Sequence, residues 1–138
     1  MTSDTKKSFD VVAAIIEDHG HIFAAQRDYG ELKGKWEFPG GKIEVGETPE
    51  EALIREIKEE LDTEITVDKF FTHIDYEYPS FFLHMDVFIC HVKSGYLQTN
   101  KGIHSEETFV PLGSLMELDW CPADRIVAGR LLEANKQN

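Results

Sequence analysis

The chain has 138 residues, of which 41% are hydrophobic and 29% are charged, with 14 basic against 26 acidic side chains. This length predicts one domain over residues 1–138, with residues 1–7 as a flexible polar tail. A net charge of −12 argues against polymeric nucleic acid and anionic membranes as partners, since both attract clustered basic residues. The chain shows no signal-peptide core, no apolar run near the roughly 20 residues of a membrane span, and no CxxC pair, which predicts a cytoplasmic protein.

The first predicted elements form a hairpin. Residues 8–16 are apolar and partly β-branched, as in a buried strand. Asp18-His19-Gly20 predicts a turn, and residues 21–27 return as the second strand. Residues 28–35 are polar with two glycines and predict a mobile loop, and residues 36–41 are aromatic and then sharply bent.

A helix is predicted over residues 49–61, because the residues at its N-terminus are typical of a helix start. Thr48 suits the N-cap, Pro49 suits the first helical position, and Glu51 completes a capping box.

Two further strands are predicted over residues 64–78 and 81–92, joined by a turn at Pro79-Ser80. In the second, Leu83 and Met85 belong to an apolar face, whereas the opposite face is mixed, as a face that lines a pocket would be.

The remaining chain predicts a loop over residues 93–104, a short strand over 108–110 and a short helix over 112–118. A final helix is expected over 123–134. Four of its residues are expected to face the core: Ile126, Val127, Leu131 and Leu132. The order of elements indicates an α/β fold, an α/β/α sandwich with a mixed sheet covered on both faces.

The helix over residues 49–61 carries a patch of carboxylates. At about 100° per residue, Glu56, Glu59 and Glu60 fall on one side, away from an apolar stripe. Three clustered carboxylates suit a hard cation such as Mg²⁺ or Mn²⁺. A solvated helix face or a Ca²⁺ site is the alternative. Arg55 can pair with Glu59 or Glu51, but nothing basic is expected to answer Glu56 or Glu60.

Acidic charge is concentrated around this helix. The segment from Glu44 to Glu64 holds nine acidic and two basic residues, which is seven of the twelve net negative charges. Bound metal ions would invert this sign and make phosphates the preferred ligands. Gly40-Gly41 permits the close backbone approach that such a site needs, although an ordinary turn is the simpler explanation.

The pattern Gly41-x5-Glu47-x7-Arg55-Glu56-Ile57-x-Glu59-Glu60 resembles the Nudix box, the signature of Nudix hydrolases. Asp62 and Thr63 depart from its usual glycine and apolar residue, and we expect this to affect the helix end rather than the chemistry. Residues 36–50 and 118–124 are similar to the MutT-type and CTP pyrophosphohydrolase-like branch.

The resemblance implies a set of metal ligands and catalytic residues. The Gly40 carbonyl, Glu56, Glu59 and Glu60 would hold Mg²⁺ or Mn²⁺, and Arg55 would orient a glutamate. Glu47 would support the loop or the outer shell of the metal. A further acid, Glu107 or its neighbour Glu106, would assist the metal or the water. Glu56, Glu59 or this loop acid would accept the proton.

It also implies a nucleotide subsite. Arg27 and Lys42 would meet phosphate oxygens or the nucleotide, and Phe38 and Trp120 would stack on it unless they belong to the core. Asp124 would read a base edge, or would instead cap the last helix.

The expected activity is Mg²⁺-dependent hydrolysis of nucleoside triphosphates to monophosphate and pyrophosphate. The first choice of substrate is (d)CTP or a modified pyrimidine nucleotide, and 8-oxo-dGTP is the second. A non-catalytic Nudix-fold regulator that binds nucleotides is the alternative of another class. The fold would allow a monomer or a homodimer.

Overall fold

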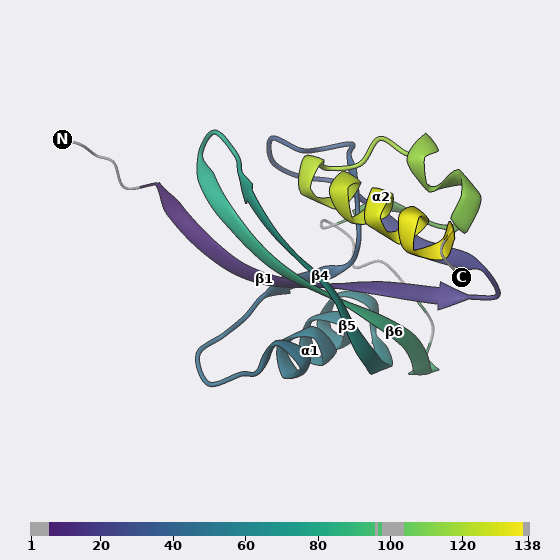
Figure 1. The fold of residues 1–138 in the computed structure, drawn as a ribbon. Coiled ribbons are helices and arrows are strands. Elements are labelled where there is room, and N and C mark those ends of the chain that lie inside the picture. The colour runs from purple at the N-terminus through teal and green to yellow at the C-terminus, as the bar shows by residue number, and fades with distance from the viewer. Residues whose placement is uncertain (1–5, 96, 98–103, 137–138) are drawn as a thin grey trace.

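A mixed seven-stranded sheet with one α-helix on each face makes up the computed structural model, which describes residues 6–95, 97 and 104–136 (Figure 1). The strands are β1 (Lys7–Asp18), β2 (His21–Arg27), β3 (Trp36–Glu37), β4 (Gly40–Lys42), β5 (Thr63–Glu77), β6 (Phe81–Gly95) and β7 (His104–Pro111). The helices are α1 (Pro49–Leu61), the 3-10 helix η1 (Leu112–Glu117) and α2 (Pro122–Lys136).

Strand β1 runs through the centre of the sheet because both of its faces are apolar. The main strand order is β3-β2-β1-β6-β5, with β4 paired to β1 and β7 paired to β2. β1 is parallel to β6 and antiparallel to β2 and β4. Its even-numbered residues, such as Val12, join the core with α1, and its odd-numbered ones, such as Ile15, join the core that contacts α2. The predicted α/β sandwich is confirmed.

The hairpin between β1 and β2 closes as predicted. His19 and Gly20 both have positive φ values, of 50° and 79°, as the tight turns that suit a twisted hairpin require. The predicted flexible tail over residues 1–7 extends too far, however, since Lys7 begins β1 and Lys6 pairs with Glu77 at 2.6 Å. Residues 1–5 lie outside the described part.

Helix α1 has the predicted bounds. The Thr48 side chain accepts from the Glu51 amide, and the Glu51 side chain accepts from the Thr48 amide, which completes the capping box. Leu53, Ile57 and Leu61 are fully buried beneath the sheet, so the apolar stripe fixes which way the carboxylates point.

The later elements are longer than predicted. β6 continues to Gly95, and β7 covers His104–Pro111 rather than three residues. Of the predicted 93–104 loop, residues 96 and 98–103 lie outside the described part. α2 buries Val127 as expected, but Ile126 is 36% exposed, so its predicted inward position is wrong. Among the described residues, no helix has the length and apolarity to cross a membrane.

Candidate functional site

The two glycines of β4 lie in close contact with neighbouring elements, Gly41 with α1 and Gly40 with β1. Gly41 lies opposite Val12 of β1, and a Cβ on Gly41 would overlap the Glu56 carboxylate. A Cβ on Gly40 would instead collide with the Val12 carbonyl oxygen. The predicted close approach is therefore confirmed, and it places a carboxylate of α1 directly against the β4 backbone.

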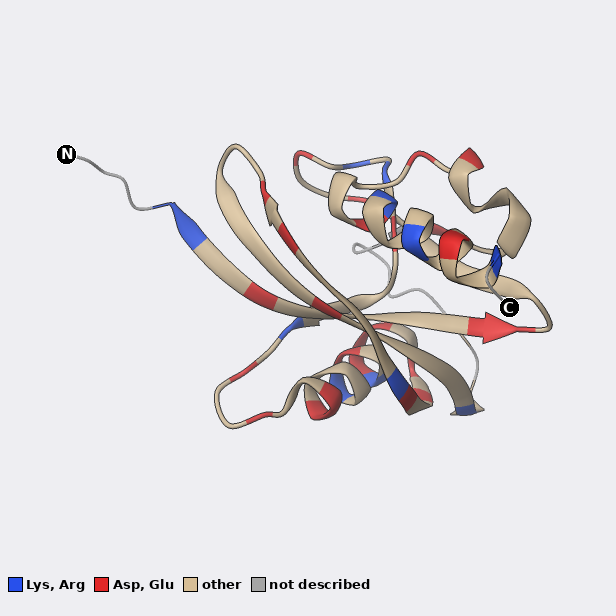
Figure 2. Ribbon diagram, in the orientation of Figure 1, with Lys and Arg blue, Asp and Glu red and all other residues tan. Residues whose placement is uncertain are grey.

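On α1 the Glu60 carboxyl group hydrogen-bonds with Glu56 and feels the negative charge of Glu59. Acidic segments gather on α1 and the loop before it (Figure 2). The Glu56 side chain is 16% exposed, whereas that of Glu59 is 60% exposed. Burial, a hydrogen bond with Glu56 and the negative charges nearby raise the pKa of Glu60 to about 9. A cluster of oxygen donors that repel one another in this way fits Mg²⁺ or Mn²⁺.

Arg55 connects this helix to the loop that precedes it. Its guanidinium donates to both oxygens of Glu47 at 2.6 and 2.9 Å, to Glu56 at 3.1 Å and to Glu59 at 3.1 Å. It also donates to the Lys42 carbonyl at 3.0 Å. The hydrogen bond from Arg55 lowers the pKa of Glu47. The expectation that no basic group answers Glu56 is wrong, and Arg55 orients three glutamates at once.

The two departures from the Nudix box lie at the exit of α1. Asp62 adopts the left-handed conformation with φ 50°, and its amide donates to the Lys58 carbonyl at 3.1 Å. Aspartate tolerates this conformation better than most residues. Thr63 is buried, and its hydroxyl donates to the Leu61 carbonyl at 2.8 Å. Both residues are therefore accommodated in the structure of the helix end.

A cavity of about 360 Å³ opens beside the carboxylates. Glu60, Gly40 and Gly41 line it, and so does the buried Asp124. Apolar and aromatic side chains complete much of its wall: Phe9, Phe38, Tyr78, Phe81, Leu83 and Met85. The apolar face of β6 thus lines this cavity through Leu83 and Met85. The mixed face lines a separate hollow through His84 and Asp86, as predicted for that face.

Asp124 is 7% exposed and accepts a hydrogen bond from the Phe38 amide at 2.9 Å. It is the third residue of α2, which begins at Pro122, so the alternative of a helix cap is wrong. Burial, aided by the charge of Glu37, raises the pKa of Asp124 to about 8. At neutral pH the cavity therefore holds a largely protonated carboxyl group, which can both donate and accept.

A partly buried ion pair lies in the same cavity as Asp124. Arg27 donates to Glu37 at 2.6 and 3.1 Å, and its guanidinium stacks 4.9 Å from the centre of the Tyr29 ring. Both Arg27 and Glu37 line the cavity. Glu37 was not among the predicted site residues. The one available signal was a charged residue between two aromatic ones, in a segment otherwise typical of the core.

The other predicted nucleotide contacts divide into two groups. Phe38 and Lys42 line the cavity, with the Lys42 ammonium 4.3 Å from the centre of the Phe9 ring. Trp120 is not among the described lining residues. Its ring stacks on Phe38 at 4.5 Å, and its indole N–H donates to the Leu115 carbonyl at 2.7 Å. Trp120 therefore packs behind Phe38.

The register of β7 separates the two candidate loop acids. Glu107 lies opposite Ala25 of β2, and Ala25 packs in the core beneath α1. Directly opposed residues of antiparallel strands share a face, so Glu107 lies on the α1 side. Glu106 lies opposite Gln26, on the other face. The geometry favours Glu107.

Comparisons with known proteins identify the family of this chain. The NUDIX domain model matches residues 6–137. The 8-oxo-dGTP diphosphatase of Proteus vulgaris is 35% identical over 99 residues, which cover 70% of this chain and 88% of that protein. The CTP pyrophosphohydrolase of Escherichia coli is 49% identical over 65 residues, which cover 46% of this chain and 48% of that protein. The solution structure of the E. coli ORF135 protein matches with a TM-score of 0.82 at 31% identity, covering 97% of this chain and 95% of that one. The chain belongs to the NUDIX family of hydrolases.

Proposed function

We propose that this chain is a pyrophosphohydrolase that uses Mg²⁺ or Mn²⁺ to convert nucleoside triphosphates to monophosphates and pyrophosphate. The observation that supports this best is that Glu60, Gly40 and the buried Asp124 line one cavity. A nucleotide in that cavity would have its phosphates beside the carboxylates and its base beside apolar side chains.

The metal ligands in this proposal are the Gly40 carbonyl, Glu56, Glu59 and Glu60. A bound divalent ion neutralises phosphate oxygens and lowers the pKa of water. Arg55 holds Glu56 and Glu59 in place through charge-assisted hydrogen bonds. Water adds at a phosphorus, and the bridging P–O bond breaks to release pyrophosphate.

The proton of the attacking water goes to one of three carboxylates. Glu56, Glu59 and Glu107 are the candidates, because each lies on or faces the α1 side of the sheet. Arg27 and Lys42 contact the phosphate oxygens or the sugar, with Glu37 fixing the orientation of Arg27.

Asp124 is the base-reading residue in this proposal. A protonated carboxyl group offers an O–H donor beside a carbonyl acceptor, which matches the N3 acceptor and N4 amine of cytosine. Cytidine nucleotides, including 5-modified forms, are therefore the first choice. The similarity to a CTP pyrophosphohydrolase supports this choice.

Oxidised purine nucleotides are the second candidate. The similarity to the 8-oxo-dGTP diphosphatase covers more of the chain than the similarity to the CTP enzyme. A protonated Asp124 can also pair with an edge that presents one donor and one acceptor, so it accommodates a purine as well.

The test is kcat/KM over CTP, dCTP, 5-methyl-dCTP, 8-oxo-dGTP and the common dNTPs, for wild type and three variants. Asp124→Ala should lower the preference for the best substrate about ten- to a hundred-fold, whereas Asp124→Asn keeps a donor and an acceptor and should retain it. The control is Asp119→Ala, since Asp119 is exposed and pairs with Lys35 at 3.0 Å. A ranking that Asp124→Ala leaves unchanged would overturn the assignment of the base-reading residue.

A further inference from the structure

A second group of metal-ligating side chains lies on the β5–β6 hairpin. His73 of β5 lies directly opposite Asp86 of β6, and Asp75 lies opposite His84. Asp86 is also the register partner of Val12, whose side chain packs beneath α1. The four side chains therefore share the α1 face of the sheet, and each is partly exposed to solvent.

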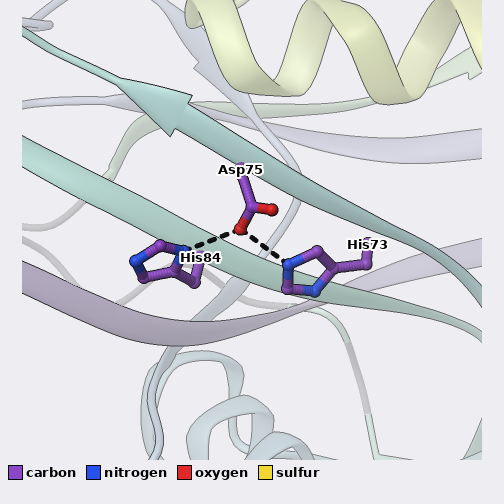
Figure 3. Close-up of side chains that lie close together, drawn as sticks. All are labelled: His73, Asp75 and His84. Carbon is purple, nitrogen blue, oxygen red and sulfur yellow. Dashed lines mark hydrogen bonds and ion pairs between the residues drawn. The ribbon is translucent and has the colours of Figure 1, made fainter.

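Three of these side chains direct ligand atoms toward one another. The Asp75 Oδ1 atom lies 2.7 Å from His73 Nε2 and 2.7 Å from His84 Nδ1 (Figure 3). One ligand atom from each residue lies within 4.8 Å of the others. Two imidazole nitrogens thus contact the same carboxylate oxygen.

The fourth side chain, that of Asp86, fixes the orientation of the His73 ring. Asp86 Oδ1 lies 2.7 Å from His73 Nδ1, which leaves Nε2 of the same ring directed at Asp75. Histidines that ligate metals commonly donate their other nitrogen to a carboxylate in this way, because it sets the tautomer and the ring orientation.

We propose that His73, Asp75 and His84 form a binding site for a late first-row divalent transition metal, such as Zn²⁺ or Cu²⁺, with water completing the coordination. Imidazole nitrogen favours these metals, whereas carboxylate and carbonyl oxygens favour Mg²⁺ and Mn²⁺. The site therefore differs in chemistry from the oxygen-only set of Gly40, Glu56, Glu59 and Glu60. It goes beyond the proposed hydrolysis and does not depend on it.

The surroundings of the site also favour a cation. A hollow of about 400 Å³ is lined by His73, His84 and Asp86, and also by Asp10 and Glu44. Val45, which like Glu44 belongs to the segment between β4 and α1, lines the same hollow, and so does Pro49 at the start of α1. An ion at the His73–His84 pair would be attracted by the acidic side chains of this hollow.

Nitrogen ligation distinguishes this site from the catalytic one. The experiment is Cu²⁺ electron paramagnetic resonance of the full chain with excess Mg²⁺, at one equivalent of Cu²⁺, together with Zn²⁺ calorimetry. Wild type should show coupling to two imidazole nitrogens. His73→Ala and His84→Ala should each remove one coupling and weaken Zn²⁺ binding by about tenfold or more, and Asp86→Asn should weaken it by about ten- to a hundred-fold.

The matched control is His91→Ala. His91 lies on the same strand as His84, is exposed, and pairs with Asp68 at 2.9 Å. This variant should keep the wild-type spectrum and affinity. The proposal would be overturned if His84→Ala kept both the two-nitrogen spectrum and the Zn²⁺ affinity, or if His91→Ala lost them. It would also be overturned if the wild-type spectrum showed no nitrogen coupling.

Discussion

Asp124 is a buried acid whose ionised form is disfavoured in the folded protein. Burial is the main cause, and Glu37 adds negative charge, although the Phe38 amide and Arg27 act in the opposite direction. An ordinary aspartate has a pKa of about 3.9, against about 8 for Asp124 in the folded chain. The folded state therefore binds this proton more tightly than the unfolded state does.

This linkage predicts a pH-dependent effect of Asp124→Asn on stability. The contribution of the protonated Asp124 to stability is complete below about pH 4 and is lost as the pH rises through about 8. An asparagine does not ionise. The melting temperature of Asp124→Asn relative to wild type should therefore increase from pH 5 to pH 8, by an amount worth on the order of a few kcal/mol.

Thermal unfolding at several pH values measures this difference. Asp119→Asn is the control, because Asp119 lies on the same stretch of chain but is exposed. This variant should show no such increase. A constant difference between wild type and Asp124→Asn across the pH range would show that Asp124 is ionised in the folded protein.

Some site residues could be predicted from the sequence and others could not. The carboxylates of α1 follow from helical spacing, which is local. Glu37 gains its role from Arg27, ten residues away, and from Asp124 on the last helix. That proximity exists only in the folded chain. The sequence predicts that Trp120 stacks on the nucleotide, because an aromatic residue of the core cannot be distinguished in the sequence from one that lines a pocket.

At the scale of the elements, α1 was predictable because its capping box and its apolar stripe are both local signals. α2 was less so. Its core face is set by Ala123, Val127 and Ala128, all fully buried. Small residues let a helix pack closely. A prediction based on large aliphatic residues overlooks them, and it therefore places Ile126 in the core.

Strand β4 allows a test that separates packing from catalysis. Alanine at Gly40 would meet the Val12 backbone, which cannot move without disturbing the sheet, so Gly40→Ala should lower stability by a few kcal/mol. The atoms nearest to an alanine Cβ at Gly41 belong to the end of the Glu56 side chain, which can move. Gly41→Ala should therefore displace a carboxylate and lower kcat while the fold is largely kept.

Urea unfolding and pyrophosphate release together check this pair of variants. The expected pattern is that the Gly40 variant loses more stability and the Gly41 variant loses more activity per unit of stability lost. Equal effects of the two substitutions on both quantities would contradict the separation.

The exit of α1 supports a prediction about stability alone. Asp62 has φ 50°, a conformation that costs an L-residue free energy and costs glycine little. Asp62→Gly should stabilise the protein by about 1 kcal/mol or less, since the exposed pair with Lys58 that it removes is worth little. Chemical denaturation measures the gain. A loss of stability, or a changed kcat, would mean that this position does more than end the helix.

At the scale of the whole molecule, most of the net charge of −12 is concentrated in one segment of the chain. Seven of these charges belong to the segment from Glu44 to Glu64, and Glu60 of that segment lines the cavity shared with Arg27 and Asp124. An acidic surface repels free phosphates, but carboxylates that hold divalent ions attract them. The charge that argues against polymeric nucleic acid is thus compatible with a metal-bound nucleotide.

The most direct test of this account is pyrophosphate release from the nucleotide panel, with MgCl₂ and with EDTA, by wild type, Glu60→Gln and Glu50→Gln. Glu50 is an exposed residue in the first turn of the same helix. We expect turnover only with MgCl₂, one pyrophosphate per monophosphate formed, a loss of about a hundred-fold or more in Glu60→Gln, and wild-type rates in Glu50→Gln. Turnover that persists in EDTA, or a Glu60→Gln variant as active as wild type, would contradict it.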